Sequence, residues 1–173
     1  DSHWFNWLCQ QFPDVETHIV ALPDPHHPQL SAWLSALQAA IGQVDEQTFI
    51  VAHSLGCVTT LRFLSEQTEA AALGGLVLVA GFAEPLVNLP ELNGFNREAL
   101  HWSAVKKHSR NSLVVLSEDD AVVAPEATER LANALHAPLL RLNHRGHFMR
   151  QNGCDTLPEV AQWLWQHLPQ LTP

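Results

Sequence analysis

Residues 48–61 read Thr48-Phe-Ile-Val-Ala-His-Ser54-Leu-Gly-Cys-Val-Thr-Thr-Leu61, and they carry the strongest structural signal in the sequence. An apolar, β-branched run leads directly into a helical segment with a serine at the corner, and such a sharp turn lifts the serine hydroxyl above the edge of a sheet. Gly56 provides a small residue two positions after the serine, while Ala52 stands where the usual pattern has its first glycine. The stretch predicts a strand–serine–helix elbow with Ser54 as nucleophile; a serine that only caps the helix is the alternative.

The rest of the chain alternates short apolar runs with segments of helical period. This alternation is typical of an α/β fold with a mostly parallel central sheet and helices on both faces. We expect buried strands at Glu16–Leu22, Thr48–Ala52, Gly75–Ala80, Ser112–Ser117 and Pro138–Leu142. Apolar residues at helical spacing predict helices over 30–41, 125–135 and 157–168. Because 173 residues are enough for one ordinary domain, we expect a single domain over 1–173.

Residues 82–108 interrupt the alternation of strands and helices. The segment carries Pro85, Pro90 and Gly94, and only residues 98–107 show a short helical signal. A loop of this length inside a compact domain is usually functional. We therefore expect a small cap around 82–108, with an irregular surface excursion as the alternative.

An acidic cluster follows the expected strand at 112–117. A serine hydroxyl is a weak nucleophile near neutral pH, so it needs a neighbouring base that is oriented by a carboxylate. In α/β hydrolases these groups follow the serine in the order acid, then histidine, each at the carboxyl end of a strand. Asp120 is the favoured acid because it precedes the hydrophobic pair Val122 and Val123, which would anchor the loop; Asp119 is the alternative.

A histidine follows the last expected strand. The run 138–148 ends the strand and turns at Gly146, directly before His147. A glycine at that position lets the loop bring the imidazole down over the serine. We therefore expect His147 to be the general base, with His144 as the alternative.

Other residues near the elbow and the cap complete the candidate site. The backbone N–H of Leu55, at the start of a helix, is placed to donate to an oxyanion that forms on an attacked carbonyl. Phe82 and Trp102 are candidates to line a small apolar acyl pocket, although tryptophans lie more often in the core. Cys57 follows the elbow, and we expect it to be a small core residue rather than a nucleophile.

The composition limits the classes of function. Hydrophobic residues make up 46% of the chain and charged residues 16%, which predicts a packed globule rather than disorder. The net charge of −9, with only nine Lys and Arg, argues against a nucleic-acid ligand. We also see no apolar run of the roughly 20 residues that a membrane span requires and no secretory signal, so we expect no membrane partner. Nothing in the sequence indicates a protein partner.

Cysteine and histidine usage bears on location and metal binding. The odd set Cys9, Cys57 and Cys154 suits free thiols in a reducing compartment, so we expect a cytoplasmic protein. The chain has eleven histidines, including the pair His26 and His27, which raises a metal-dependent hydrolase as a competing class. No ligand set at the spacing of a zinc site supports that class, and we expect neither a metal nor a cofactor.

The sequence resembles the retinoblastoma-binding-protein-9-like serine hydrolases, which include the bacterial YdeN-type proteins. The resemblance covers almost the whole chain, including Asp1-Ser-His-Trp-Phe-Asn-Trp-Leu8. Its sharpest pieces are 52–56 (Ala-His-Ser-Leu-Gly), the pair Asp119-Asp120 before two valines, and 146–148 (Gly-His-Phe). The resemblance implies a compact α/β hydrolase that cleaves small esters or amides without a cofactor, and it implies the triad Ser54, Asp120 and His147. It does not identify the substrate.

Members of that family open with an apolar strand and a glycine-containing loop that this sequence lacks. In their topology the strand lies between those expected here at 16–22 and 48–52, so its loss would leave unpaired backbone groups that cost about 1–3 kcal/mol each. We therefore expect residues upstream of residue 1, and we expect the second oxyanion donor to lie there.

A non-catalytic protein-binding module on a hydrolase fold is the alternative function, since a fold does not guarantee activity.

Overall fold

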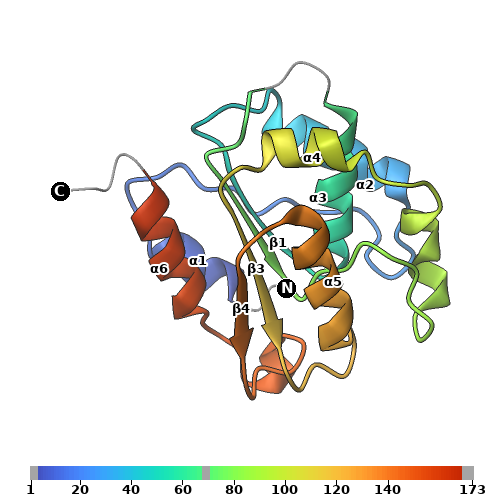
Figure 1. The fold of residues 1–173 in the computed structure, drawn as a ribbon. Helices are drawn as coiled ribbons and strands as arrows, with labels where there is room; N and C mark the ends of the chain where they lie inside the picture. Colours follow the sequence, from blue (N-terminus) through green and yellow to red (C-terminus); the bar gives the residue numbers. More distant parts are fainter. Residues whose placement is uncertain (1–3, 68–70, 169–173) are drawn as a thin grey trace.

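The computed structural model describes residues 4–67 and 71–168 and contains a four-stranded parallel sheet (Figure 1). The strands β1 (Phe49–His53), β2 (Gly75–Val79), β3 (Ser112–Ser117) and β4 (Leu139–Leu142) lie side by side in sequence order. Within the described ranges, the helices are α1 (Phe5–Gln10), α2 (Leu30–Ile41), α3 (Leu55–Glu66), α4 (Trp102–His108), α5 (Pro125–Leu135) and α6 (Pro158–His167), with 3-10 helices η1 (Pro90–Asn96) and η2 (Arg150–Asn152). The predicted α/β class is confirmed. Residues 1–3 of the family-like N-terminal segment lie outside the described residues.

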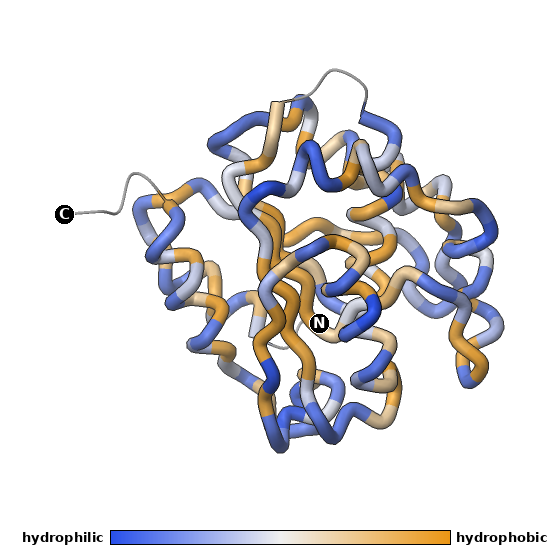
Figure 2. Tube along the Cα trace, viewed as in Figure 1, coloured by the Kyte–Doolittle hydropathy of each residue, from blue (hydrophilic) through white to orange (hydrophobic). Residues whose placement is uncertain are grey.

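The two central strands alternate their side chains between two core layers. Leu76 and Leu78 of β2 pack in a cluster that includes residues of α2, α3 and α5. Val77 and Val79, the intervening residues, pack in a cluster that includes residues of α1 and α6. A parallel sheet covered on both faces needs strands that are apolar throughout, and Figure 2 shows this as a continuous hydrophobic band through the centre. The helices therefore cover both faces, as the alternation predicts.

The predicted strand at Glu16–Leu22 is wrong for the described residues. A strand exists only where its backbone N–H and C=O groups form a ladder with a neighbour. No strand of the described ranges pairs with residues 16–22, and the segment forms neither helix nor strand, with Ile19 46% exposed. The expectation that all strands are buried also needs correction: β2 and β3 are fully buried, whereas β1 and β4 are the outer strands and are partly exposed.

The cap is shorter than the predicted range of 82–108. The last part of that range forms α4, which packs beside α3 and α5 and leads into β3. Two parallel neighbours such as β2 and β3 need a crossover connection, and α4 supplies its helix. The remaining residues 82–101, here called the cap segment, contain η1 and irregular chain.

The cap segment is attached to the rest of the fold by side-chain contacts. Glu84 forms an ion pair with Arg130 of α5, with 2.6 Å between Oε1 and Nη2. The side chain of Asn88 donates a hydrogen bond of 2.8 Å to the carbonyl oxygen of Val122. On the other side, Arg62 of α3 reaches the main chain near the end of η1. These contacts hold the segment against α3, α5 and the loop after β3.

Within the described ranges, we find no helix with the length and apolar character of a membrane span.

Candidate active site

Ser54 stands at the corner between β1 and α3. Its backbone has φ 53° and ψ −122°, a positive φ that non-glycine residues rarely adopt. The Ser54 N–H donates a 2.9 Å hydrogen bond to the carbonyl oxygen of Val79, which fixes the corner to β2. A Cβ built on Gly56 would lie 3.9 Å from the Cβ of Ala52, an ordinary contact. The strand and the helix therefore face each other at Ala52 and Gly56, and an alanine would fit in place of Gly56.

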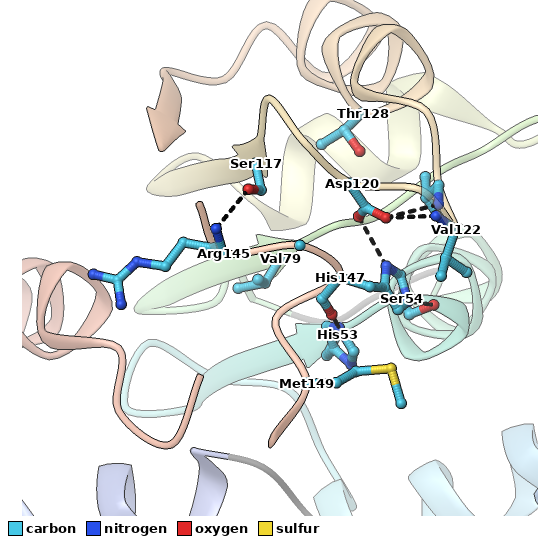
Figure 3. Close-up of polar contacts among 12 residues, drawn as sticks. His53, Ser54, Val79, Ser117, Asp120, Val122, Thr128, Arg145, His147 and Met149 are labelled. Atoms are coloured by element: carbon cyan, nitrogen blue, oxygen red, sulfur yellow. Dashed lines mark hydrogen bonds and ion pairs between the residues drawn. The ribbon is translucent and has the colours of Figure 1, made fainter. Parts of the chain in front are cut away.

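The imidazole of His147 links Ser54 to Asp120 (Figure 3). His147 Nε2 lies 2.9 Å from Ser54 Oγ, and His147 Nδ1 lies 2.8 Å from Asp120 Oδ2. The side chains of His147 and Asp120 are only 6% and 2% exposed. Ser54, Asp120 and His147 follow the carboxyl ends of β1, β3 and β4, respectively. The parallel sheet therefore brings the three residues to one edge.

The carboxylate of Asp120 is oriented by the loop that follows it. Its Oδ1 accepts hydrogen bonds from the N–H groups of Val122 at 2.8 Å and Val123 at 3.0 Å, so Oδ2 remains for the imidazole. An ionised carboxylate can only accept, so Nδ1 of His147 carries a proton in this arrangement. Nε2 then presents its lone pair to the Ser54 hydroxyl. The arrangement is therefore suited to remove the proton of Ser54.

The two alternative residues lie elsewhere in the same loops. Asp119 Oδ1 accepts a 2.5 Å hydrogen bond from the Ser117 hydroxyl and contacts the N–H groups of Arg145 and Gly146, both at 3.2 Å. The Ser117 hydroxyl is the main cause that lowers the pKa of Asp119. His144 is exposed, with φ 58°. The structure thus brings Asp120 and His147 to Ser54, and it places Asp119 against the main chain of the histidine loop.

Main-chain contacts hold the loop that carries His147. Gly146 has φ 49°, and a Cβ there would lie 2.6 Å from Cγ of Asn152, so the position requires glycine. Asn152 Oδ1 accepts hydrogen bonds from the N–H groups of His147 at 3.2 Å and Met149 at 3.3 Å. His53 Nε2 lies 2.8 Å from the carbonyl oxygen of His147. Sequence reasoning missed His53 and Asn152; the only available signal was that His53 directly precedes the predicted nucleophile.

The remaining predicted residues are distributed around the elbow. Leu55 begins α3, and its N–H belongs to the first turn of the helix, where N–H groups lack an intrahelical acceptor. Phe82 is fully buried in the same cluster as Leu55, but Trp102 packs on the cluster formed with α2 and α3. The two pocket candidates therefore pack in different clusters of the core.

Within residues 4–67 and 71–168, cysteine and histidine side chains do not form a second candidate centre. The Cys57 thiol is fully buried, burial raises its pKa, and it points to the carbonyl oxygen of Val79 at 3.5 Å. This environment favours the neutral thiol and suits a core residue. Among the residues that the structure describes, no three His, Cys, Asp or Glu side chains converge as metal ligands would.

This chain is similar to known proteins over almost its whole length. The profile of the family described as serine hydrolase matches residues 1–166. YdeN of Bacillus subtilis (strain 168) is 34% identical over 173 residues, which cover 99% of this chain and 91% of YdeN. The serine hydrolase RBBP9 of Rattus norvegicus is 26% identical over 165 residues, 93% of this chain and 86% of that protein. The crystal structure of the B. subtilis ydeN gene product matches with a TM-score of 0.92 and 35% identity, covering 95% of this chain and 90% of that chain.

Proposed function

This chain belongs to the serine hydrolase family, and on that premise we propose that it hydrolyses small esters or amides through an acyl-enzyme on Ser54. The observation that carries the proposal is the continuous path of contacts from Ser54 through His147 to Asp120, with heavy-atom distances of 2.9 and 2.8 Å. These distances lie within the range over which a base can accept a proton directly. Neither a metal nor a cofactor is part of the proposal.

In the first half of the reaction, His147 Nε2 takes the proton of Ser54 while Oγ attacks the substrate carbonyl carbon. The carbonyl oxygen becomes an oxyanion, and the N–H of Leu55, the first residue of α3, donates to it. The resulting imidazolium is stabilised by the buried carboxylate of Asp120. Collapse of the intermediate breaks the bond to the alcohol or amine, which takes the proton from His147.

In the second half, water attacks the acyl-enzyme. His147 takes a proton from that water, a second oxyanion forms, and the bond to Ser54 Oγ breaks as the serine regains its proton. The acid product leaves and the triad returns to its starting state.

We also propose a cytoplasmic location, because Cys9, Cys57 and Cys154 are free thiols, which a reducing compartment maintains.

The test combines a fluorophosphonate probe with p-nitrophenyl esters of graded acyl length. The wild-type protein should be labelled and should turn over at least one ester, whereas Ser54→Ala should lose both reactions. Ser35→Ala is the matched control, since Ser35 is an exposed serine on α2 whose hydroxyl donates to the carbonyl oxygen of Ser31 in the same helix. If the folded wild-type protein is neither labelled nor active, the proposal is wrong and a protein-binding role on a hydrolase fold is favoured.

A further inference from the structure

Both main-chain polar groups of His147 are held by side chains. The carbonyl oxygen lies 2.8 Å from His53 Nε2, and the N–H donates to Asn152 Oδ1 at 3.2 Å. A carbonyl oxygen only accepts, so His53 donates from Nε2 in this contact. The backbone of His147 is thus fixed on two sides by contacts that do not involve the side chains of Ser54, His147 or Asp120.

His53 occupies a position that is itself well fixed. It is the last residue of β1 and directly precedes Ser54, so its backbone belongs to the strand that carries the elbow. Its ring packs edge-on against Trp4 and Phe5 of the N-terminal helix region, with centroid distances of 6.4 Å to each. Trp4 is fully buried. These contacts give the His53 ring little freedom to move away from His147.

The rings of His53 and His147 also lie next to each other, with centroids 4.8 Å apart (Figure 3). His53 therefore connects to His147 in two ways, through the ring and through the main-chain carbonyl. The two residues are 94 positions apart in the chain, so the contact joins the elbow to the histidine loop directly. The contact thus lies between the residue that directly precedes Ser54 and the backbone of His147.

We propose that His53 is a positioning residue, which ties the carbonyl of His147 to β1 and so holds the imidazole at the proton-transfer distance from Ser54. This inference rests on the proposed function. Proton transfer is steeply sensitive to geometry, and a displacement of about 1 Å can cost on the order of 100-fold in rate. His53 acts through His147 rather than on the substrate, so its loss should lower kcat and leave KM nearly unchanged.

The experiment compares three replacements that differ in their hydrogen-bonding reach. His53→Leu removes the donor, His53→Gln keeps an N–H at the end of a side chain of similar length, and His53→Asn keeps the same amide one methylene shorter. We expect His53→Leu and His53→Asn to lower kcat and the rate of fluorophosphonate labelling by about 10- to 100-fold, with KM within about 2-fold of wild type. His53→Gln should stay within about 3-fold of wild type.

Controls separate positioning from packing and from failure of the main proposal. His101→Leu is the matched control, because His101 is an exposed histidine remote from the elbow in sequence. The melting temperature of each variant is measured beside its rate. If His53→Leu does not fold, the comparison of His53→Gln with His53→Asn still decides.

The inference is overturned if the leucine or asparagine variant reacts at the wild-type rate, or if the glutamine variant falls as far as they do at the same melting temperature. Those results would leave the proposed function intact, provided that wild type is labelled and Ser54→Ala is not. Absence of labelling in folded wild type would instead refute the proposed function itself.

Discussion

The carboxylates of Asp119 and Asp120 are neighbours in sequence but contact different parts of one loop. Asp120 Oδ2 lies 2.8 Å from the imidazole of His147, whereas Asp119 Oδ1 lies 3.2 Å from the N–H groups of both Arg145 and Gly146. One carboxylate therefore orients the side chain of the proposed base, and the other holds the main chain that leads to it. Both residues follow the same strand, so their place after β3 does not separate these roles; the valine pair after Asp120 was the signal that favoured it as the acid.

The different contacts predict different kinetic consequences for the two aspartates. In Asp120→Asn the amide oxygen keeps the contacts with the N–H groups of Val122 and Val123, so an NH2 donor faces Nδ1 and the Nδ1–H tautomer is lost; kcat should fall by about 10⁴-fold. Asp119→Asn retains an oxygen acceptor for the loop amides and should lower kcat by less than about 10-fold. Ester hydrolysis by the purified variants measures both. A larger loss for Asp119→Asn than for Asp120→Asn would reverse the assignment of the acid.

Asp119 should also affect the acid stability of the protein. The hydrogen bond from Ser117, followed by those from the loop amides, lowers the pKa of Asp119 from its ordinary value of 3.8. A lowered pKa in the folded state means that the stabilising contribution is complete above 3.8 and is lost as the pH falls through the folded-state pKa. Wild type should therefore melt above Asp119→Asn by a constant margin from about pH 7 to about pH 5.

The margin between the two melting curves should close below pH 3.8, where the wild-type carboxyl also becomes neutral. Differential scanning calorimetry over this pH range measures it. Asp155→Asn is a suitable control, because Asp155 forms an exposed ion pair with Arg150 away from the Ser117 hydroxyl. If the difference in melting temperature between wild type and Asp119→Asn grew as the pH fell, the pKa of Asp119 would not be lowered in the folded protein.

Local sequence signals predicted the elements whose cause is local. The strand at Ser112–Ser117 and the helix that Pro125 begins were predicted with the observed bounds, because apolar runs and a proline in the first turn act within a few residues. The strand at Glu16–Leu22 was wrong, because a strand also requires a partner that its own residues do not specify. The meeting of Ser54, Asp120 and His147 was predictable from chain order, since parallel strands bring their carboxyl ends to one edge.

The contacts behind the site could not be predicted in the same way. His53 and Asn152 contact the backbone of His147 through their side chains. The elbow pattern accepts any residue at position 53, and Asn152 belongs to no pattern that the sequence analysis used. The pocket candidates Phe82 and Trp102 were predicted from their place in or beside the expected cap, which does not specify the core cluster that each ring joins. Such packing depends on the full three-dimensional arrangement of the helices.

Arg62 should stabilise the cap segment. Its guanidinium is buried in α3 and donates to the carbonyl oxygens of Phe95 at 2.8 Å, Ala99 at 3.3 Å and Glu98. Arg62→Met would leave these acceptors without their charged donor, so the free energy of unfolding should fall by about 2–4 kcal/mol. Urea denaturation measures this loss. Arg97→Met is the control, since Arg97 is an exposed arginine in the same segment. If both variants lose the same free energy of unfolding, the buried contacts of Arg62 do not stabilise the cap segment.

Cys57 should be inert although it lies three residues after Ser54. Burial raises the pKa of its thiol, and the side chain is fully buried against the carbonyl oxygen of Val79. Iodoacetamide should therefore modify the partly exposed Cys9 well before Cys57 in the folded protein, as mass spectrometry of peptides would show. Cys57→Ala should keep fluorophosphonate labelling within about 3-fold of wild type. Loss of labelling in a folded Cys57→Ala protein would give the thiol a part in the reaction.

The backbone of Ser54 should make the elbow less stable than a glycine would. Its φ of 53° and ψ of −122° lie in a region that glycine adopts freely and that costs other residues about 1–3 kcal/mol. Ser54→Ala keeps this cost, whereas Ser54→Gly removes it and loses only part of the gain to the greater freedom of glycine in the unfolded chain.

Ser54→Gly should therefore exceed Ser54→Ala in free energy of unfolding by about 1 kcal/mol in urea titrations, although both variants lack the nucleophile. The comparison isolates the backbone, because both changes remove the same contact between Ser54 Oγ and His147. A Ser54→Ala protein as stable as Ser54→Gly would mean that the corner relaxes without the serine, and that the positive φ is not imposed by the fold.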